Sequence, residues 1–185
     1  MAENLDAADT GLAGGNRQAL DELFSLAYEE LRRLAATVRR GDPSATINPT
    51  ALANEVWLKL ARSPSLGSLP RVSFMRVAAR AMRQVLVEAA RRRKADKRGG
   101  GPALVAFDEA LQPAATGSDY LLALDEALDE LARINPRQAT MIESRFFGGL
   151  DVAETAELLQ VSEVTIHRDW RVARAWLAQQ LRRDG

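Results

Sequence analysis

Hydrophobic residues recur every three or four positions along most of the chain, and no segment alternates as a β-strand would. Together with capping residues and glycine or proline stops, this spacing predicts a series of helices. They are expected at residues 16–40, 48–62, 71–94, 119–131, 135–147, 151–159 and 162–177. The pattern therefore predicts an all-α fold.

A stretch rich in glycine, proline and alanine divides these helices into two groups. Residues 97–102, Lys-Arg-Gly-Gly-Gly-Pro, end the third helix, and residues 99–118 are typical of a linker. We therefore expect a loose tail at 1–15, a first helical domain at 16–98, a flexible linker at 99–118 and a second helical domain at 119–185.

Residues 150–177 show the pattern of two short helices around a tight turn. Asp151 and Glu154 match a capping box, and Ser162 can cap the second helix. That helix has a basic face opposite an apolar one, which is formed by Ile166, Trp170, Ala173 and Leu177. The layout is typical of a helix-turn-helix, whose second helix enters the DNA major groove. On this stretch alone, two ordinary amphipathic helices with a solvated basic face are the alternative.

The formal net charge of zero hides a strong segregation of charge along the chain. Residues 71–98 carry ten Lys/Arg and two Asp/Glu, whereas residues 99–161 carry three Lys/Arg and eleven Asp/Glu. From residue 162 onward the chain is again slightly basic, with five Lys/Arg and three Asp/Glu. The basic block suits a polyanion such as DNA, and the acidic block is expected to stay away from DNA.

The composition argues against several classes of protein. The chain has no cysteine and one histidine, so disulfides and Cys- or His-rich metal sites are not expected. No phosphate-binding loop or hydrolase motif is present, and the carboxylates are spaced as on exposed helix surfaces. No apolar run reaches membrane-spanning length, and residues 1–15 lack a signal-peptide core. We expect a cytoplasmic, non-enzymatic protein without metal or cofactor.

Two parts of the sequence carry a resemblance to a known family. They are Ala78–Arg83 together with Ala90–Gly101, and Arg168–Leu177. Over residues 20–181 the chain resembles bacterial RNA polymerase sigma factors of the extracytoplasmic-function (ECF) group. Within the group it is most similar to a branch abundant in planctomycetes and some proteobacteria and acidobacteria. The resemblance implies that the first domain is sigma region 2 and the second is sigma region 4.

In this family, the helix that corresponds to residues 50–61 binds the clamp coiled coil of the polymerase. Residues 51–60, Ala-Leu-Ala-Asn-Glu-Val-Trp-Leu-Lys-Leu, are similar to the family's pattern, although Ala51 stands where an acid is usual. The resemblance therefore implies polymerase contacts by Leu52, Asn54, Glu55, Trp57 and Leu58. For Trp57, a place in the hydrophobic core is an equal alternative.

The helix from residue 74 to 98 resembles the part of the family that opens the promoter and recognises its −10 element. Cations would hold the phosphates of single-stranded DNA, and a pocket or stacking surface would hold an extruded base. Residues implied in this role are Phe74, Arg76, Arg80, Arg83, Arg91, Arg92, Arg93, Lys94, Lys97 and Arg98. Phe74 is the only aromatic residue among them, so the loop at 63–73 is a second candidate for the base pocket. A nonspecific basic tail is the alternative for residues 91–98.

The helix-turn-helix then corresponds to the part that recognises the −35 element. Its candidate DNA contacts are Ser162, Thr165, His167, Arg168, Arg171 and Arg174. Ser162 and Thr165 are expected near phosphates. His167, Arg168 and Arg171 are best placed for base edges, with arginine favouring guanine. For His167 the alternative is an inert surface residue. Asp169 is expected to form a salt bridge that fixes a neighbouring arginine.

The resemblance implies a sigma factor that binds core RNA polymerase and promoter DNA, with an anti-sigma factor or other regulator as a further candidate partner. A stand-alone helix-turn-helix regulator is the alternative, but it leaves the helix at 50–61 and the second basic region unexplained. The charge segregation adds the hypothesis that the acidic block faces the basic block when core polymerase is absent.

Overall fold

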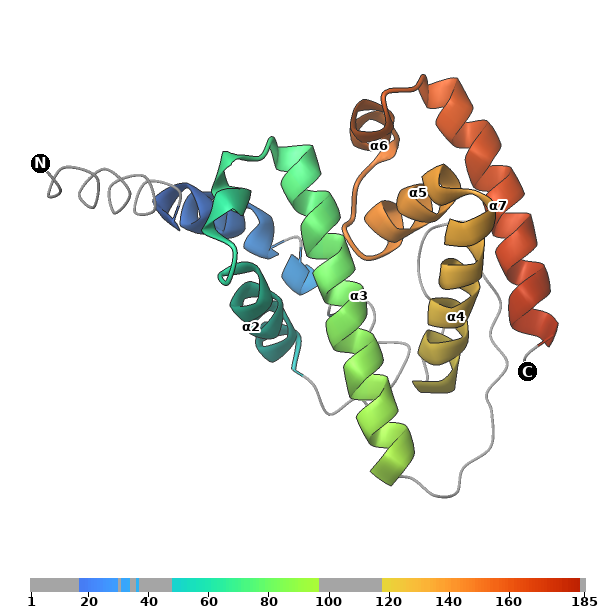
Figure 1. The fold of residues 1–185 in the computed structure, drawn as a ribbon, viewed down its shortest axis with the longest axis horizontal. Coiled ribbons are helices and arrows are strands. Elements are labelled where there is room, and N and C mark those ends of the chain that lie inside the picture. Colours follow the sequence, from blue (N-terminus) through green and yellow to red (C-terminus); the bar gives the residue numbers. More distant parts are fainter. Residues whose placement is uncertain (1–16, 30, 34–35, 37–47, 97–117, 184–185) are drawn as a thin grey trace, which may run out of the picture.

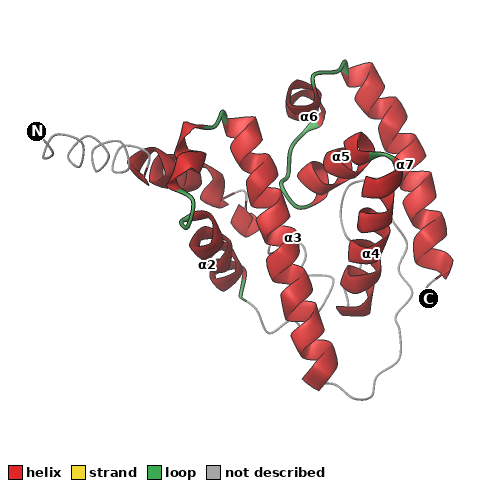
Figure 2. Cartoon of the chain, in the orientation of Figure 1, coloured by secondary structure: helices red, strands yellow, loops and turns green. Residues whose placement is uncertain are grey.

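The computed structural model describes residues 17–29, 31–33, 36, 48–96 and 118–183. All regular elements in these ranges are helices, and no strand occurs among them, which confirms the all-α fold (Figure 2). The expected tail at 1–15 and nearly all of the expected linker lie outside the described residues.

The helices follow one another along the chain in the order that the hydrophobic pattern predicts (Figure 1). A first helix covers residues 17–29 and 31–33. It is followed by α2 (Pro49–Leu60), a short 3-10 helix η1 (Pro64–Ser68), α3 (Arg71–Asp96), α4 (Ser118–Ile134), α5 (Pro136–Phe146), α6 (Val152–Leu159) and α7 (Glu163–Arg183).

The η1 helix lies in the segment at 63–73 that was expected to be a loop, and α7 continues beyond residue 177, the predicted end of its helix.

Local capping explains where two of these helices begin. The Asn48 side chain accepts a hydrogen bond from the Thr50 backbone N–H at 3.0 Å, and Pro49 occupies the first turn of α2. Asn135 accepts from the Gln138 N–H at 3.1 Å in the same way at the start of α5. In both places an Asn-Pro pair satisfies one free N–H and removes another, so the starts were predictable from sequence.

The long helix α3 is buried on two sides. One buried stripe includes Phe74, Ala78 and Val85, which lie in the core. A second buried stripe consists of Met75, Ala79, Met82, Leu86 and Ala90. A helix with two apolar stripes must be covered by neighbours on both sides.

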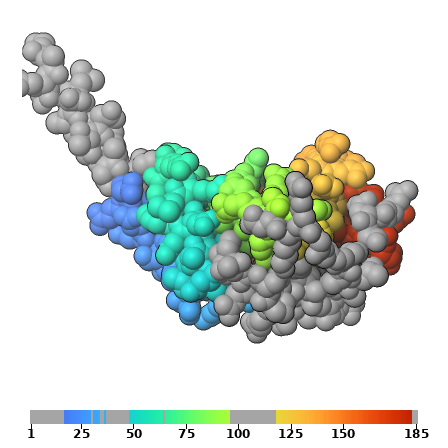
Figure 3. All heavy atoms as spheres, turned by 90° about the horizontal axis from the view of Figure 1, so that it is seen from below, coloured from blue at the N-terminus to red at the C-terminus, as the bar shows by residue number. Residues whose placement is uncertain are grey.

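The two halves of the chain provide this cover. The helix α2 packs on one side of α3, and α4, α5 and α6 pack on the other (Figures 1 and 3). A single cluster of buried residues runs through both sides. Helices of both predicted domains therefore pack against α3 in this structure. We call this the closed arrangement.

Gly148, between α5 and α6, packs tightly against α3. A Cβ atom added to this glycine would lie 2.9 Å from the Ala79 Cβ and 3.2 Å from the Met75 backbone oxygen. It would also lie 2.6 Å from the Ser144 backbone oxygen. Only a residue without a side chain fits this contact, because real Cβ atoms do not approach other heavy atoms so closely.

Candidate nucleic-acid interface

The first helix of the helix-turn-helix, α6 (Val152–Leu159), begins with a complete capping box. The Asp151 carboxylate accepts from the Glu154 N–H at 2.8 Å, and the Glu154 carboxylate accepts from the Asp151 N–H at 3.0 Å. At the other end, Gln160 adopts the left-handed conformation with φ 54°, and the Val161 N–H donates to the Ala156 carbonyl at 3.1 Å. These contacts confirm the predicted cap and end α6 at a tight turn.

The second helix, α7, begins at a hydroxyl cap. Ser162 Oγ accepts from the Thr165 N–H at 3.2 Å, which confirms the predicted cap. The two side-chain hydroxyls also lie 2.9 Å apart in a hydrogen bond. Ser162 is exposed and Thr165 is half-buried, so a phosphate could reach the first hydroxyl more easily than the second.

The two faces of α7 differ as the spacing predicts. Ile166, Ala173 and Leu177 are buried, and the half-buried Trp170 ring lies under the Arg145 guanidinium at 4.5 Å. The residues proposed to contact base edges, His167, Arg168 and Arg171, lie on the exposed side, whereas the further DNA-contact candidate Arg174 is half-buried. A helix N-terminus with exposed cations can approach base edges in the major groove.

Asp169 lies in α7 but faces inward, and it is buried. Its carboxylate accepts from the Arg137 guanidinium of α5 at 2.6 and 3.0 Å, whereas Arg168 Nε lies 3.7 Å away. The expected salt bridge is therefore present, but its main partner comes from another helix. It ties α7 to α5 instead of only fixing a neighbour in α7.

Replacement of Asp169 by asparagine should destabilise the protein by about 1–3 kcal/mol, because the neutral amide weakens a charge-assisted pair at a buried position. The measurement is the urea midpoint for unfolding, followed by circular dichroism. Glu157→Gln is the matched control, since Glu157 is exposed on α6 and its change should stay within about 0.5 kcal/mol. Equal midpoints for the two variants would contradict a stabilising role for the Asp169–Arg137 pair.

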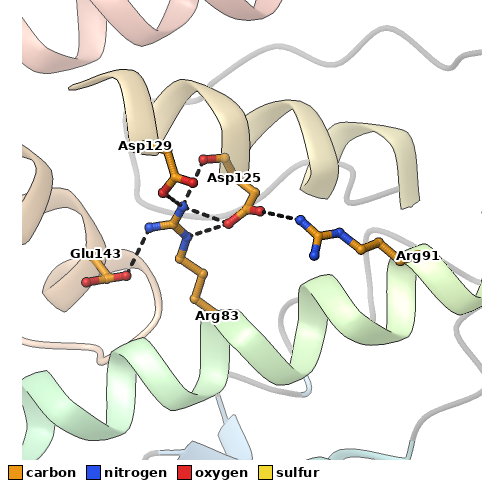
Figure 4. Close-up of polar contacts among 5 residues, drawn as sticks. All are labelled: Arg83, Arg91, Asp125, Asp129 and Glu143. Carbon is orange, nitrogen blue, oxygen red and sulfur yellow. Dashed lines mark hydrogen bonds and ion pairs between the residues drawn. The ribbon is translucent and has the colours of Figure 1, made fainter. Parts of the chain in front are cut away.

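A partly buried ion cluster joins α3 to α4 and α5 (Figure 4). Arg83 donates to the Asp125 carboxylate at 2.8 Å, to the Asp129 carboxylate at 2.6 Å and to Glu143 at 3.2 Å. It also donates to the Asp125 backbone oxygen at 2.8 Å, and its own side chain is only 13% exposed. We call Arg83, Asp125, Asp129 and Glu143 the Arg83 cluster.

The carboxylates of the Arg83 cluster compensate for the burial of its guanidinium. Burial by itself would lower the pKa of Arg83, because it disfavours the charged form. The hydrogen bond to Asp129 and the charge of Asp125 outweigh that effect, so the pKa of Arg83 is raised. The arginine therefore stays charged at every physiological pH.

Further ion pairs join α3 to the second half of the chain. Arg91 lies 3.3 Å from the second carboxylate oxygen of Asp125, and Lys94 lies 3.0 Å from Asp119. Arg71, at the other end of α3, pairs with Glu154 of the capping box. The basic block thus faces the acidic block, as the charge segregation predicted.

Comparison with known families identifies the family of the chain. A family model described as ECF sigma factor matches residues 10–183, which is nearly the whole sequence. The chain belongs to the ECF sigma factor family. Comparisons with curated proteins and with solved structures give no match.

In this sigma factor, α2 divides the candidate polymerase-binding residues between its two faces. Asn54 is exposed, Leu58 is 62% exposed and Glu55 is half-buried. Leu52 lies in the core, and the half-buried Trp57 ring packs 4.6 Å from Phe24, centroid to centroid. In this structure, therefore, Leu52 offers no surface to a partner, and Trp57 mainly joins α2 to the first helix.

The candidate −10 residues of the sigma factor also fall into groups. Arg76, Arg80 and Arg92 are exposed, and within the described residues no ion pair engages them. Arg83, Arg91 and Lys94 are held by carboxylates, and half-buried Arg93 donates to the Ala89 carbonyl at 3.5 Å. Lys97 and Arg98 lie outside the described residues.

Phe74 does not provide the stacking surface that was considered for an extruded base. Its side chain is fully buried between α3 and its neighbours. An aromatic ring covered on both faces cannot stack on a base without local unfolding. The segment at 63–73, which includes η1, is the other candidate for a base pocket, and that assignment stays a prediction.

The described part of the sigma factor shows two further negative features. No helix there is long and apolar enough to cross a membrane. The same residues contain no group of three or more His, Cys, Asp or Glu side chains that could hold a metal ion.

Proposed function

We propose that this ECF sigma factor binds core RNA polymerase and directs it to specific promoters, with α7 on the −35 duplex and α3 at the −10 element. The observation that supports this best is the exposed face of α7, where His167, Arg168 and Arg171 follow a well-capped turn. Arginine can donate two hydrogen bonds to guanine, and phosphate contacts supply the remaining affinity.

The exposed side of α2 is the proposed contact with polymerase. Asn54 and Leu58 are four positions apart, so they lie on one face of the helix, with Glu55 beside them. A leucine that is largely exposed at the centre of such a face can fill a pocket on a partner. By contrast, Leu52 is proposed to support this face from within the core.

The −10 element is proposed to contact α3 in two stages. Arg76, Arg80 and Arg92 are accessible in the closed arrangement and can attract phosphates at once. Arg83, Arg91 and Lys94 are paired with carboxylates of α4 and α5, and these pairs must separate before all three cations can bind phosphates. Promoter opening would therefore require departure from the closed arrangement.

Other features of the proposal follow from the family. The protein is proposed to act in the cytoplasm, without catalysis or cofactor, and to belong to the branch abundant in planctomycetes and proteobacteria. The two domains keep the proposed boundaries 16–98 and 119–185, joined through residues 99–118. An anti-sigma factor or other regulator is a further proposed partner.

Transcription in vitro tests the proposal. Core polymerase supplied with the protein and fragmented genomic DNA should produce transcripts with discrete start sites, and core polymerase alone should not. A stand-alone regulator would bind DNA but would neither bind core polymerase nor produce new start sites. That second result would replace the sigma function with the regulator function.

A further inference from the structure

Val164 is a largely exposed apolar side chain at the start of α7. It is 78% exposed and lies in the first turn of α7, next to the hydroxyl cap formed by Ser162 and Thr165. Isolated hydrophobic residues on a surface need no explanation by themselves. The position of Val164 relative to the basic face of α7 supplies a second observation.

Val164 lies on the same face as the proposed base contacts. His167, Arg168 and Arg171 follow it at spacings of three, four and seven residues, and all four side chains are exposed. Such spacing places side chains along one side of a helix. The buried residues Ile166 and Ala173 lie on the other side, so nothing in the core requires a valine here.

The chemistry of the major groove indicates a target for this side chain. Valine has no hydrogen-bonding group, and the only apolar group that an unmodified base pair presents in the major groove is the 5-methyl group of thymine. Residues near the N-terminus of a recognition helix contact the base edges. An aliphatic side chain at this place favours a thymine over the other bases.

We propose that Val164 is a specificity-determining residue that contacts the 5-methyl group of one thymine in the −35 duplex. This inference rests on the proposed function, since it requires α7 in the major groove. Val164 would select thymine through apolar contact, whereas Arg168 and Arg171 would select guanine through hydrogen bonds. The element should therefore contain a thymine near its guanines.

Deoxyuridine substitution tests the contact, because it removes one methyl group and keeps the base pair. Holoenzyme first selects duplexes from a library in which random sequence replaces the −35 element. A duplex enriched in this way is the probe. Each thymine is replaced singly, and holoenzyme affinity is measured by fluorescence anisotropy. One position should lose affinity about fourfold, the value for burial of a single methyl group.

Two variants connect that position to Val164. Val164→Ala should bind the thymine and deoxyuridine duplexes equally, because the contact is already lost. Val172→Ala is the matched control: Val172 is also exposed, at 55%, but it lies about 80° around the helix from Val164. It should keep the fourfold preference.

Two results would overturn the inference while leaving the sigma function intact. One is an enriched duplex with no methyl-sensitive position, and the other is a preference that Val164→Ala retains. Failure of holoenzyme to enrich any duplex, although the protein binds core polymerase, would overturn both this inference and the −35 role of α7. Unchanged circular dichroism of the variants would show that the exposed positions do not affect folding.

Discussion

Replacement of Arg83 by glutamate should open the closed arrangement. The new carboxylate would face Asp125, Asp129 and Glu143, so three attractive contacts would become repulsive at a site that is 13% exposed in the native protein. Reversal of a charge in a buried ion pair costs at least as much as loss of one partner, about 3–5 kcal/mol. Small-angle scattering of the free protein should show a clearly larger radius of gyration.

Arg76→Glu is the matched control for this experiment. Arg76 lies on the same helix and undergoes the same change of charge, but it is exposed, and within the described residues no ion pair engages it. This variant should keep the native radius of gyration. If both variants scatter alike, the Arg83 cluster does not hold the closed arrangement.

A charge swap adds a second criterion. Asp125→Arg in the background of Arg83→Glu exchanges the charges of the two positions. The double variant should therefore recover part of the native, smaller radius of gyration. High salt should have little effect on the native protein, because Arg83, Asp125 and Glu143 are largely shielded from solvent and the second apolar stripe of α3 lies beneath the same interface. The exposed Lys94–Asp119 pair should contribute little.

Replacement of Leu58 by aspartate should abolish most of the affinity for core polymerase. Leu58 is the large exposed apolar residue of α2, and a charge there would be desolvated in the complex. Loss of a central apolar contact costs 2 kcal/mol or more, which corresponds to roughly a thirtyfold weaker complex. Titration of labelled protein with core polymerase measures this change.

Ile134→Asp provides the comparison for Leu58→Asp. Ile134 is also a large exposed hydrophobic residue, but it ends α4 in the other half of the chain. Core affinity of this variant should remain near the native value. The proposed role of α2 would be wrong if Leu58→Asp bound core polymerase as tightly as Ile134→Asp, provided both variants fold.

Features set by neighbouring residues were predictable from the sequence. The caps at Asn48, Asn135 and Asp151 are local, since each needs only the next two or three residues. The buried face of α7 was also predictable, because Ile166, Ala173 and Leu177 follow one helical stripe. These features determined the fold class and the helix-turn-helix.

Features set by distant parts of the chain were not predictable in the same way. The second stripe of α3 contains methionine and small alanine residues, such as Met75 and Ala79, whose burial depends on helices far along the sequence. Charge segregation indicated that the two blocks attract each other, but it could not indicate which arginine becomes buried. Arg83 is distinguished from Arg80 only by the side of α3 on which it lies.

Residue type alone did not predict the roles of Leu52, Phe74 and Trp57. Cores and protein interfaces both favour leucine and aromatic side chains, so residue type alone does not separate the two roles. The structure places Leu52 and Phe74 in the core and leaves Leu58 exposed. Only the position around each helix axis, together with the packing partners, makes that distinction.

The contact between Lys94 and Asp119 joins two points that are already connected by the chain. Residues 97–117 link α3 to α4 covalently, so α4 cannot diffuse away when the Arg83 cluster opens. Reclosure is then a first-order process, and a tether of this kind gives an effective concentration on the order of millimolar. Dilution of the protein should therefore leave the balance between closed and open forms unchanged. A partner that binds the basic residues of α3 must displace the carboxylates of α4, which the tether always keeps nearby.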